Sequence, residues 1–129
     1  MREAVTWANA ERLVRGWLAD RTGIPTYTET GDNPPELYLI VARVGGSRLD
    51  PHERDIDVEV TVYAGDRSAL WGAARAVETA MAALAAAGTK DGYVDDVVEA
   101  FGFAIDPAAT DRAQRVATAT YTLTCRPSR

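Results

Sequence analysis

The chain has 129 residues, 47% of them hydrophobic and 26% charged, a balance typical of one soluble globular domain and unlike that of disordered chains. Its net charge is −5, which argues against a broad phosphate-binding surface. The single cysteine excludes an internal disulfide, and neither a signal peptide pattern nor a membrane-spanning apolar run is present. We expect one domain over residues 1–129 that stays in the cytoplasm after synthesis.

The first part of the chain predicts a helix and then a loop. Apolar side chains recur at three- and four-residue spacing from about residue 2 to residue 20, as in an amphipathic helix. They are Trp7, Ala10, Val14, Trp17 and Leu18. Gly23 and Pro25 are expected to end this helix. The segment 30–36, with Asp32 and Asn33 before two prolines, predicts an exposed loop.

The middle of the chain predicts two strands. Residues 37–44 form an apolar run that predicts the first strand, which ends at two glycines. Residues 47–54, which include Arg48, Asp50 and His52, predict a polar loop. From residue 55 to residue 63, apolar and polar side chains alternate strictly, which predicts a strand with one buried face. The polar face carries Asp55, Asp57, Glu59, Thr61 and Tyr63.

A second helix is predicted from Asp66 or Ser68 to a stop at Gly88. Its large apolar stripe lies beside a second stripe of small residues. The large stripe is Leu70, Ala74, Val77, Met81 and Leu84, and the small one is Ala69, Ala73, Ala76, Ala80, Ala83 and Ala87. Trp71 stands outside both stripes. We expect Trp71 and the alanines Ala73, Ala76 and Ala80 to contact another subunit.

The last third predicts two strands, 93–105 and 115–126, joined by a polar turn. The second of these alternates threonines with an apolar set that includes Tyr121 and Cys125. The expected fold class is therefore α+β, with elements in the order helix, strands, helix, strands. Two helices pack on one face of a largely antiparallel sheet, and the acidic, threonine-rich face is open to solvent or to another subunit.

Residues with catalytic potential are few. His52 is the only histidine, and a weak metal site with Asp50 and Asp55 lacks any recognised ligand spacing, so a solvated loop histidine is the better interpretation. Cys125 belongs to an apolar set and is expected to be inert. No phosphate-binding glycine loop is present. We expect no catalytic residue, no resident metal and no cofactor, and the protein is not expected to be an enzyme.

The three carboxylates Asp55, Asp57 and Glu59 allow one alternative. Alternate residues of a strand point to the same face, and metal-dependent hydrolases also gather carboxylates in this way. Such enzymes need further ligands from other elements, whereas the final strand offers only threonines on its polar face. An acidic face that is solvated or lines an interface is therefore preferred, and a metal-dependent hydrolase stays open as the less favoured reading.

Beyond these patterns, the chain from about Glu11 to Pro127 resembles the tail terminator proteins of siphophages, especially those of phages that infect actinobacteria. The resemblance is strongest in residues 41–84, VARVGGSRLDPHERDIDVEVTVYAGDRSALWGAARAVETAMAAL. In this stretch a strand ending in two glycines leads through a polar loop to the alternating strand and the alanine-rich helix. The late segment ATYTLTCRP resembles the closing strand of the family.

This resemblance implies a structural virion protein that forms a ring, commonly a hexamer, on the last ring of the tail tube protein. Such a ring halts tube growth and provides the face that joins the head-tail connector, or neck. DNA would pass its lumen without specific binding. We expect Asp55, Asp57 and Glu59 to face this lumen or a neighbouring subunit, because carboxylates repel phosphate. The loops that contain Asp32, Asn33, Arg48, Asp50 and His52 are expected to dock on the tube or the neck.

The nearest alternative to a terminator is another neck component, such as a head completion or adaptor protein. The sequence does not distinguish the two, because both are expected to be small ring-forming proteins without catalytic chemistry. Either would reside in the virion after assembly.

Overall fold

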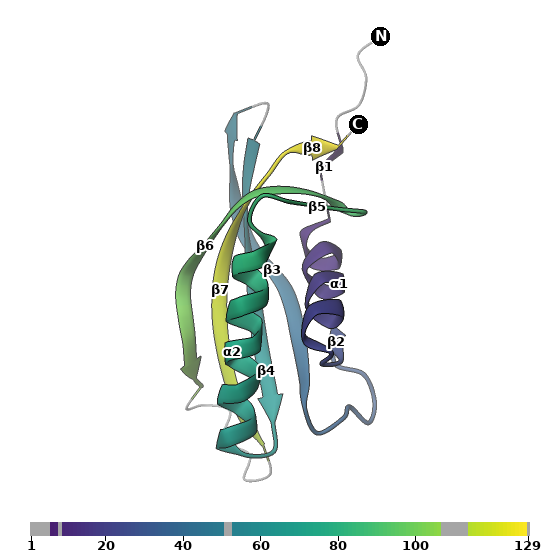
Figure 1. Ribbon diagram of the computed structural model, residues 1–129, viewed down its shortest axis with the longest axis vertical. Coiled ribbons are helices and arrows are strands. Elements are labelled where there is room, and N and C mark those ends of the chain that lie inside the picture. Colours follow the sequence, from purple (N-terminus) through teal and green to yellow (C-terminus); the bar gives the residue numbers. More distant parts are fainter. Residues whose placement is uncertain (1–5, 8, 51–52, 107–113, 129) are drawn as a thin grey trace.

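The computed structural model describes residues 6–7, 9–50, 53–106 and 114–128, and in it two helices lie side by side on one face of a curled sheet (Figure 1). The elements follow the predicted order of helix, strands, helix, strands. Within the described residues, no helix combines the length and apolar character needed to cross a membrane.

Helix α1 (Ala10–Thr22) begins later than the sequence predicted. The side chain of Asn9 accepts a hydrogen bond from the backbone N–H of Arg12, 3.1 Å away, and so caps the first turn. Before this cap, strand β1 (Thr6–Trp7) pairs with strand β8 (Pro127–Ser128) near the end of the chain. Placing Trp7 on the helix was therefore wrong. The predicted end is confirmed, because Gly23 adopts the left-handed φ of 71° that closes the helix.

The prediction of a largely antiparallel sheet is wrong, because the six-stranded sheet is mixed. Its order is β2 (Thr26–Tyr27), β3 (Tyr38–Asp50), β4 (Glu53–Ala64), β7 (Arg115–Cys125), β6 (Gly92–Ile105) and β5 (Ala87–Thr89). Strand β2 runs parallel to β3, and the other neighbours are antiparallel. The loop of residues 28–37 carries the chain back to the starting end of the sheet, so β3 leaves in the same direction as β2 (Figure 1).

The polar loop predicted over residues 47–54 is mostly strand. Strand β3 continues to Asp50 and pairs with β4 through Arg48, which lies opposite Arg54. The two glycines permit this continuation. Gly46 has a φ of 146°, and a Cβ there would lie 2.4 Å from the carbonyl oxygen of Asp55, so a side chain cannot replace it without a local shift. His52 lies outside the described residues.

Helix α2 (Arg67–Leu84) is capped by the carboxylate of Asp66, which accepts from the N–H of Ala69 at 2.7 Å. The helix ends at Leu84, with Ala85 as its C-cap, and not at Gly88, because β5 begins at Ala87. The large apolar stripe of α2 is fully buried against the helix-covered face of β4. That face consists of Ile56, Val58, Val60 and Val62, each 0% exposed, which confirms the predicted core of the sheet.

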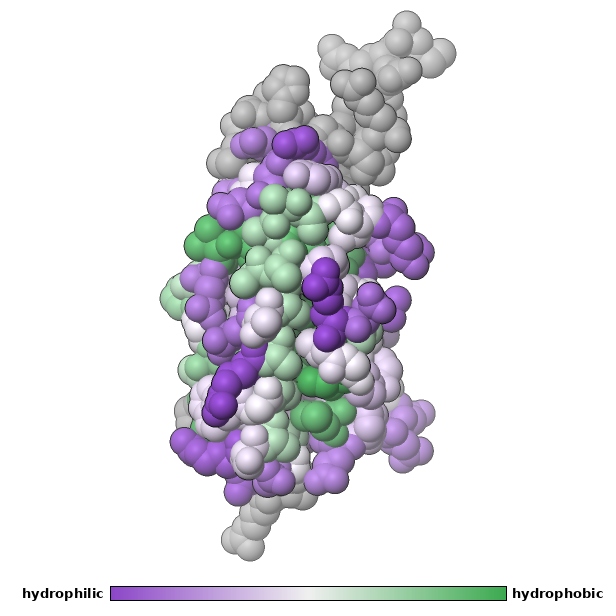
Figure 2. All heavy atoms as spheres, in the orientation of Figure 1, coloured by the Kyte–Doolittle hydropathy of each residue, from purple (hydrophilic) through white to green (hydrophobic). Residues whose placement is uncertain are grey.

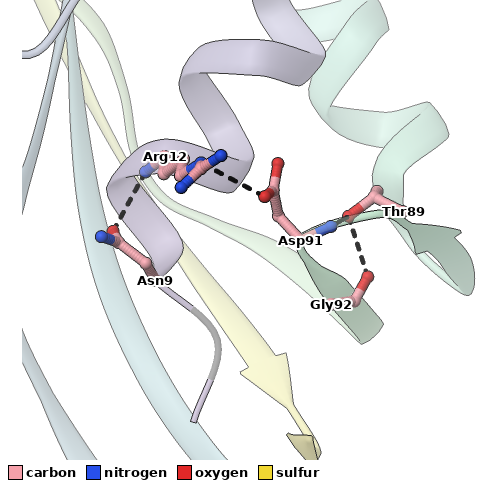
Figure 3. A network of polar contacts seen from close by, with 5 residues as sticks. All are labelled: Asn9, Arg12, Thr89, Asp91 and Gly92. Carbon is pink, nitrogen blue, oxygen red and sulfur yellow. Dashed lines mark hydrogen bonds and ion pairs between the residues drawn. The ribbon is translucent and has the colours of Figure 1, made fainter.

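Two polar contacts fix α1 in place. The indole Nε1 of Trp17 donates to the carbonyl oxygen of Ala80 at 2.7 Å and so joins α1 to α2. At the other end of α1, Arg12 forms an ion pair with Asp91, 3.3 Å away in the turn between β5 and β6 (Figure 3). The first contact joins the two helices, and the second joins α1 to the turn before β6.

Candidate subunit interface

The face of the sheet opposite the helices carries the carboxylates of β4. Asp55, Asp57 and Glu59 are partly buried there, beside β7. The hydroxyl of Thr122 donates to Asp57 Oδ1 at 2.7 Å, and that of Thr124 donates to Asp55 Oδ1 at 2.8 Å. The threonines on the polar face of β7 are thus hydrogen-bond partners of the acidic strand, and together the two strands make an ordered, negatively charged surface.

This acidic surface does not have the form of a metal centre. Alternate residues of one strand lie roughly 7 Å apart, too far for one ion to bridge all three carboxylates. Among the described residues, no group of three or more His, Cys, Asp or Glu side chains is placed to hold a metal ion. The metal-dependent hydrolase therefore gains no geometric support from the described part of the chain.

The predicted contact residues of α2 do not form one patch. Ala73 and Ala80 are each 5% exposed because they pack in the core, so they offer little surface to another subunit. Ala76 is partly buried and lines a groove on the α1 side of the helix. The groove is also lined by Arg21, Thr79, Ala80 and Ala83. Trp71 precedes Ala76 by five residues, which places it about 140° away around the helix.

What α2 does present to the surface is a narrow apolar strip. Figure 2 shows this pale strip along the helix, flanked by hydrophilic side chains on both sides. The strip is made of small residues and offers little area in comparison with a large hydrophobic side chain. Trp71, which is partly buried, stays a predicted contact, but the alanine side of the helix is a weaker candidate than the sequence suggested.

The predicted docking segments lie at opposite ends of the molecule. Asp32 and Asn33 are exposed in the loop between β2 and β3, as predicted for residues 30–36. Arg48 and Asp50 belong to the strand that leads to the hairpin between β3 and β4. Figure 1 shows the loop at the lower end and the hairpin at the upper end. Their contact with a tube or neck stays a prediction.

Sequence patterns did not reveal the long open edge of β6. Strand β5 pairs only with residues 92–94, so from Asp95 to Ile105 one side of β6 has no neighbour among the described strands. Val98 is 53% exposed and Phe101 is 73% exposed. A long edge with exposed apolar side chains is a template for pairing with another chain. The only signal in the sequence was the broken alternation between residues 97 and 103.

A second open edge lies at the other side of the sheet. Strand β2 pairs only with Leu39 and Ile40, so the rest of β3 has no strand neighbour on that side in the described structure. Val44 there is 52% exposed. The backbone N–H of Arg43 donates to Glu11 Oε2 of α1 at 2.8 Å, so one edge donor is satisfied within the subunit.

Cys125 is placed as predicted. It is fully buried in the core beneath the helices, and burial raises the pKa of its thiol to about 11, with smaller contributions from Asp95 and Asp55. A thiol with a raised pKa is protonated at neutral pH and is a poor nucleophile.

Comparisons with known proteins give a likeness in structure but none in sequence. No protein family matches the sequence, and no curated protein matches it either. The fold is similar to that of a chain in a solved structure described as the virion of a native gene transfer agent particle. The similarity has a TM-score of 0.62 and covers 84% of each chain, at 14% sequence identity. The chain therefore shares its fold with a component of a virion.

Proposed function

We propose that the protein is a structural component of a phage-type virion, and specifically a tail terminator that forms a ring on the end of the tail tube. The observation that carries the proposal is the fold likeness to a chain of a gene transfer agent virion over 84% of both chains. The sequence resemblance in residues 41–84 supports the terminator role in particular. The described residues add no arrangement that requires a metal or a cofactor.

The two open sheet edges supply what a ring needs. A ring is built from heterologous contacts, in which each subunit offers two different patches. Here one patch is the edge of β3 and the other is the edge of β6. Because β3, β4, β7 and β6 alternate in direction, β6 of one copy would run antiparallel to β3 of the next. Successive copies, commonly six in such rings, would then share one continuous sheet.

Such a ring has an inside and an outside. The helices form a thick layer on one face of each sheet (Figure 1), and a thick layer fits better on the longer, outer circumference. The acidic face with Asp55, Asp57 and Glu59 would then line the lumen. Carboxylates repel the phosphates of DNA, so the DNA would pass without binding.

The two ends of the subunit suit two different partners. With the sheet in the wall of the ring, the loop containing Asp32 and Asn33 and the hairpin approached by Arg48 and Asp50 would lie on opposite faces of the ring. One face would meet the tail tube protein, and the other would meet the head-tail connector. Before assembly the subunit would be in the host cytoplasm, and afterwards at the neck end of the tail.

The test is to mix the purified protein with purified tail tubes and to measure tube lengths and ends by electron microscopy. A terminator adds a ring to one tube end and stops further growth, so tubes polymerised in its presence are shorter. Binding to the portal side of heads without capping of tubes would instead identify a head completion or adaptor protein. A chain that binds neither tubes nor heads would contradict the proposal.

A triple variant tests the lumen assignment separately. Replacement of Asp55, Asp57 and Glu59 by lysine turns a repelling surface into one that binds DNA. We expect reduced delivery of DNA by particles that carry this variant, with tubes still capped. The exposed helix variant Asp20→Lys, on α1 and away from the acidic face, is the control. Wild-type assembly and wild-type delivery by the triple variant would show that these carboxylates do not face the lumen.

A further inference from the structure

One row of residues crosses the whole sheet and joins its two open edges. Arg43 on β3 lies opposite Val58 on β4, Val58 lies opposite Tyr121 on β7, and Tyr121 lies opposite Glu99 on β6. Val58 and Tyr121 are buried beneath the helices, so this row lies on the helix-covered face. A basic residue therefore marks one edge and an acidic residue marks the other edge at the same level of the sheet.

A hollow of about 240 Å³ lies at the acidic end of this row. It is lined by Glu78 and Ala82 of α2, by Val97 and Glu99 of β6, and by Tyr121 of β7. Its two carboxylates are exposed and have no cationic partner among the described residues, and Tyr121 forms its buried wall. An acidic hollow of this kind favours a cation that brings its own hydrogen-bond donors.

Tyr121 gives the hollow an independent polar group. The residue is 3% exposed, and its hydroxyl is buried without a hydrogen-bond partner within the described structure. Burial raises the pKa of this hydroxyl, and the charges of Glu99 and Glu78 and a side-chain hydrogen-bond contribution from Glu99 raise it further. Glu99 is thus close enough to interact with the hydroxyl, although the contact falls short of full hydrogen-bond geometry. A buried polar group without a partner costs stability, which indicates that a partner arrives from outside the subunit.

We propose that the side chain of Arg43 of one copy enters the hollow of the next copy and binds Glu78, Glu99 and Tyr121. This inference rests on the ring assembly proposed above. Arg43 is exposed, and its guanidinium has no carboxylate partner in the described part of its own subunit. A guanidinium has five N–H donors, enough for two carboxylates and a phenol oxygen.

The edge geometry places the two halves of this site together. When β3 of one copy pairs with β6 of the next copy without a shift along the strands, the residue rows align and Arg43 lies beside Glu99. The bond from Glu11 to the Arg43 backbone must then open so that the edge N–H can join the ladder. Glu11 thus protects the edge in the free subunit and releases it on assembly.

Charge exchange tests the contact directly. Arg43→Glu and Glu99→Arg should each weaken self-association at least tenfold, as measured by sedimentation velocity across concentrations. The double variant, in which the two charges are exchanged, should recover most of the association. Arg67→Glu and Asp20→Arg change exposed charges outside the row and serve as matched controls. If the isolated protein is monomeric, the same comparison is made by the occupancy of tube ends.

Tyr121→Phe gives a second readout that a merely structural role would not produce. Removal of the unpartnered hydroxyl should leave the Tm of the free subunit unchanged or raised, and should weaken association severalfold. A lowered Tm with unchanged association would overturn the site. Single charge variants that associate like the wild type would also overturn the proposed Arg43 site. If those variants still cap tubes, the terminator proposal is unaffected. Failure of the wild type to bind tubes would instead refute the proposed function.

Discussion

Strands β4 and β6 have similar lengths but opposite surroundings. Strand β4 is paired on both sides, with β3 and with β7, and its core-facing residues are fully buried. Strand β6 loses its outer neighbour after Val94, and its Phe101 is 73% exposed. The contrast indicates that β4 stabilises the subunit from both sides, whereas β6 beyond Val94 is held by β7 alone among the described strands.

The register of the two strands differs in the same way. Strand β4 pairs with β7 without interruption from Arg54 to Ala64. Strand β6 pairs with the other side of β7 through three register shifts, two of them beside Phe101. Bulges twist an edge and hinder indiscriminate pairing. The shifts beside Phe101 therefore make β6 a poor template for indiscriminate pairing.

The largest expected effect on stability is a cavity in β4. Val60→Ala should lower the free energy of unfolding by about 2–3 kcal/mol, because two buried methyl groups are lost and a cavity remains. The matched change on β6, Val98→Ala, should cost less than about 0.5 kcal/mol because Val98 is mostly exposed. Urea unfolding measures both values, and similar losses at the two positions would remove the distinction between the strands.

A charge at the edge of β6 should reverse this pattern. Phe101→Asp removes the most exposed large apolar side chain and puts a charge where a partner would pack, so we expect at least tenfold weaker self-association or tube capping. Its unfolding free energy should change by less than about 0.5 kcal/mol. Ser68→Asp in the exposed first turn of α2 is the control. Undiminished capping by the Phe101 variant would show that β6 is not an assembly edge.

The same contrast explains how much of the fold could be predicted. Strict alternation identified the buried and polar faces of β4 because this strand lies in the middle of the sheet, with helices on one side only. Cap chemistry located the end of α1 at Gly23. Strand direction could not be predicted, because β2 is two residues long and its parallel pairing depends on the path of the following loop. Gly45 and Gly46 predict the end of a strand, whereas in the structure β3 continues through them.

The candidate site was predicted only in part. The acidic face of β4 follows from spacing, and its threonine partners on β7 lie where the alternation of β7 predicted a polar face. The hollow at Tyr121 could not be predicted, because it forms only where Glu78 of α2 and Glu99 of β6 come together in the folded chain. Sequence spacing does not show which helix residue packs beside which strand residue. Tyr121 itself belonged to the predicted apolar set, and only the structure shows its hydroxyl without a partner.

A smaller effect should separate the carboxylates of the two strands. Asp57→Ala should cost about 1 kcal/mol of unfolding free energy, because the hydroxyl of Thr122 loses its acceptor. Glu99→Ala should cost nothing or stabilise the free subunit, because it removes a charge close to Glu78 and the buried Tyr121 hydroxyl. Unfolding at low protein concentration measures both, and a larger loss from Glu99→Ala would mean that Glu99 already has a partner within the subunit.

The last effect appears only at high pH and concerns Cys125, where β7 still has both neighbours, Arg54 on β4 and Val94 on β6. Burial first, and then Asp95 and Asp55, raise the pKa of its thiol from 9.0 to about 11. As the pH rises above 9, the unfolded thiol releases its proton first, so the free energy of unfolding should fall between pH 9 and pH 11 and be unaffected by this group below pH 9. The difference between wild type and Cys125→Ala isolates the thiol from the tyrosines. A difference that stays constant from pH 7 to pH 11 would mean that the thiol is reached by solvent, and that the fully paired end of β7 opens as readily as the β6 edge.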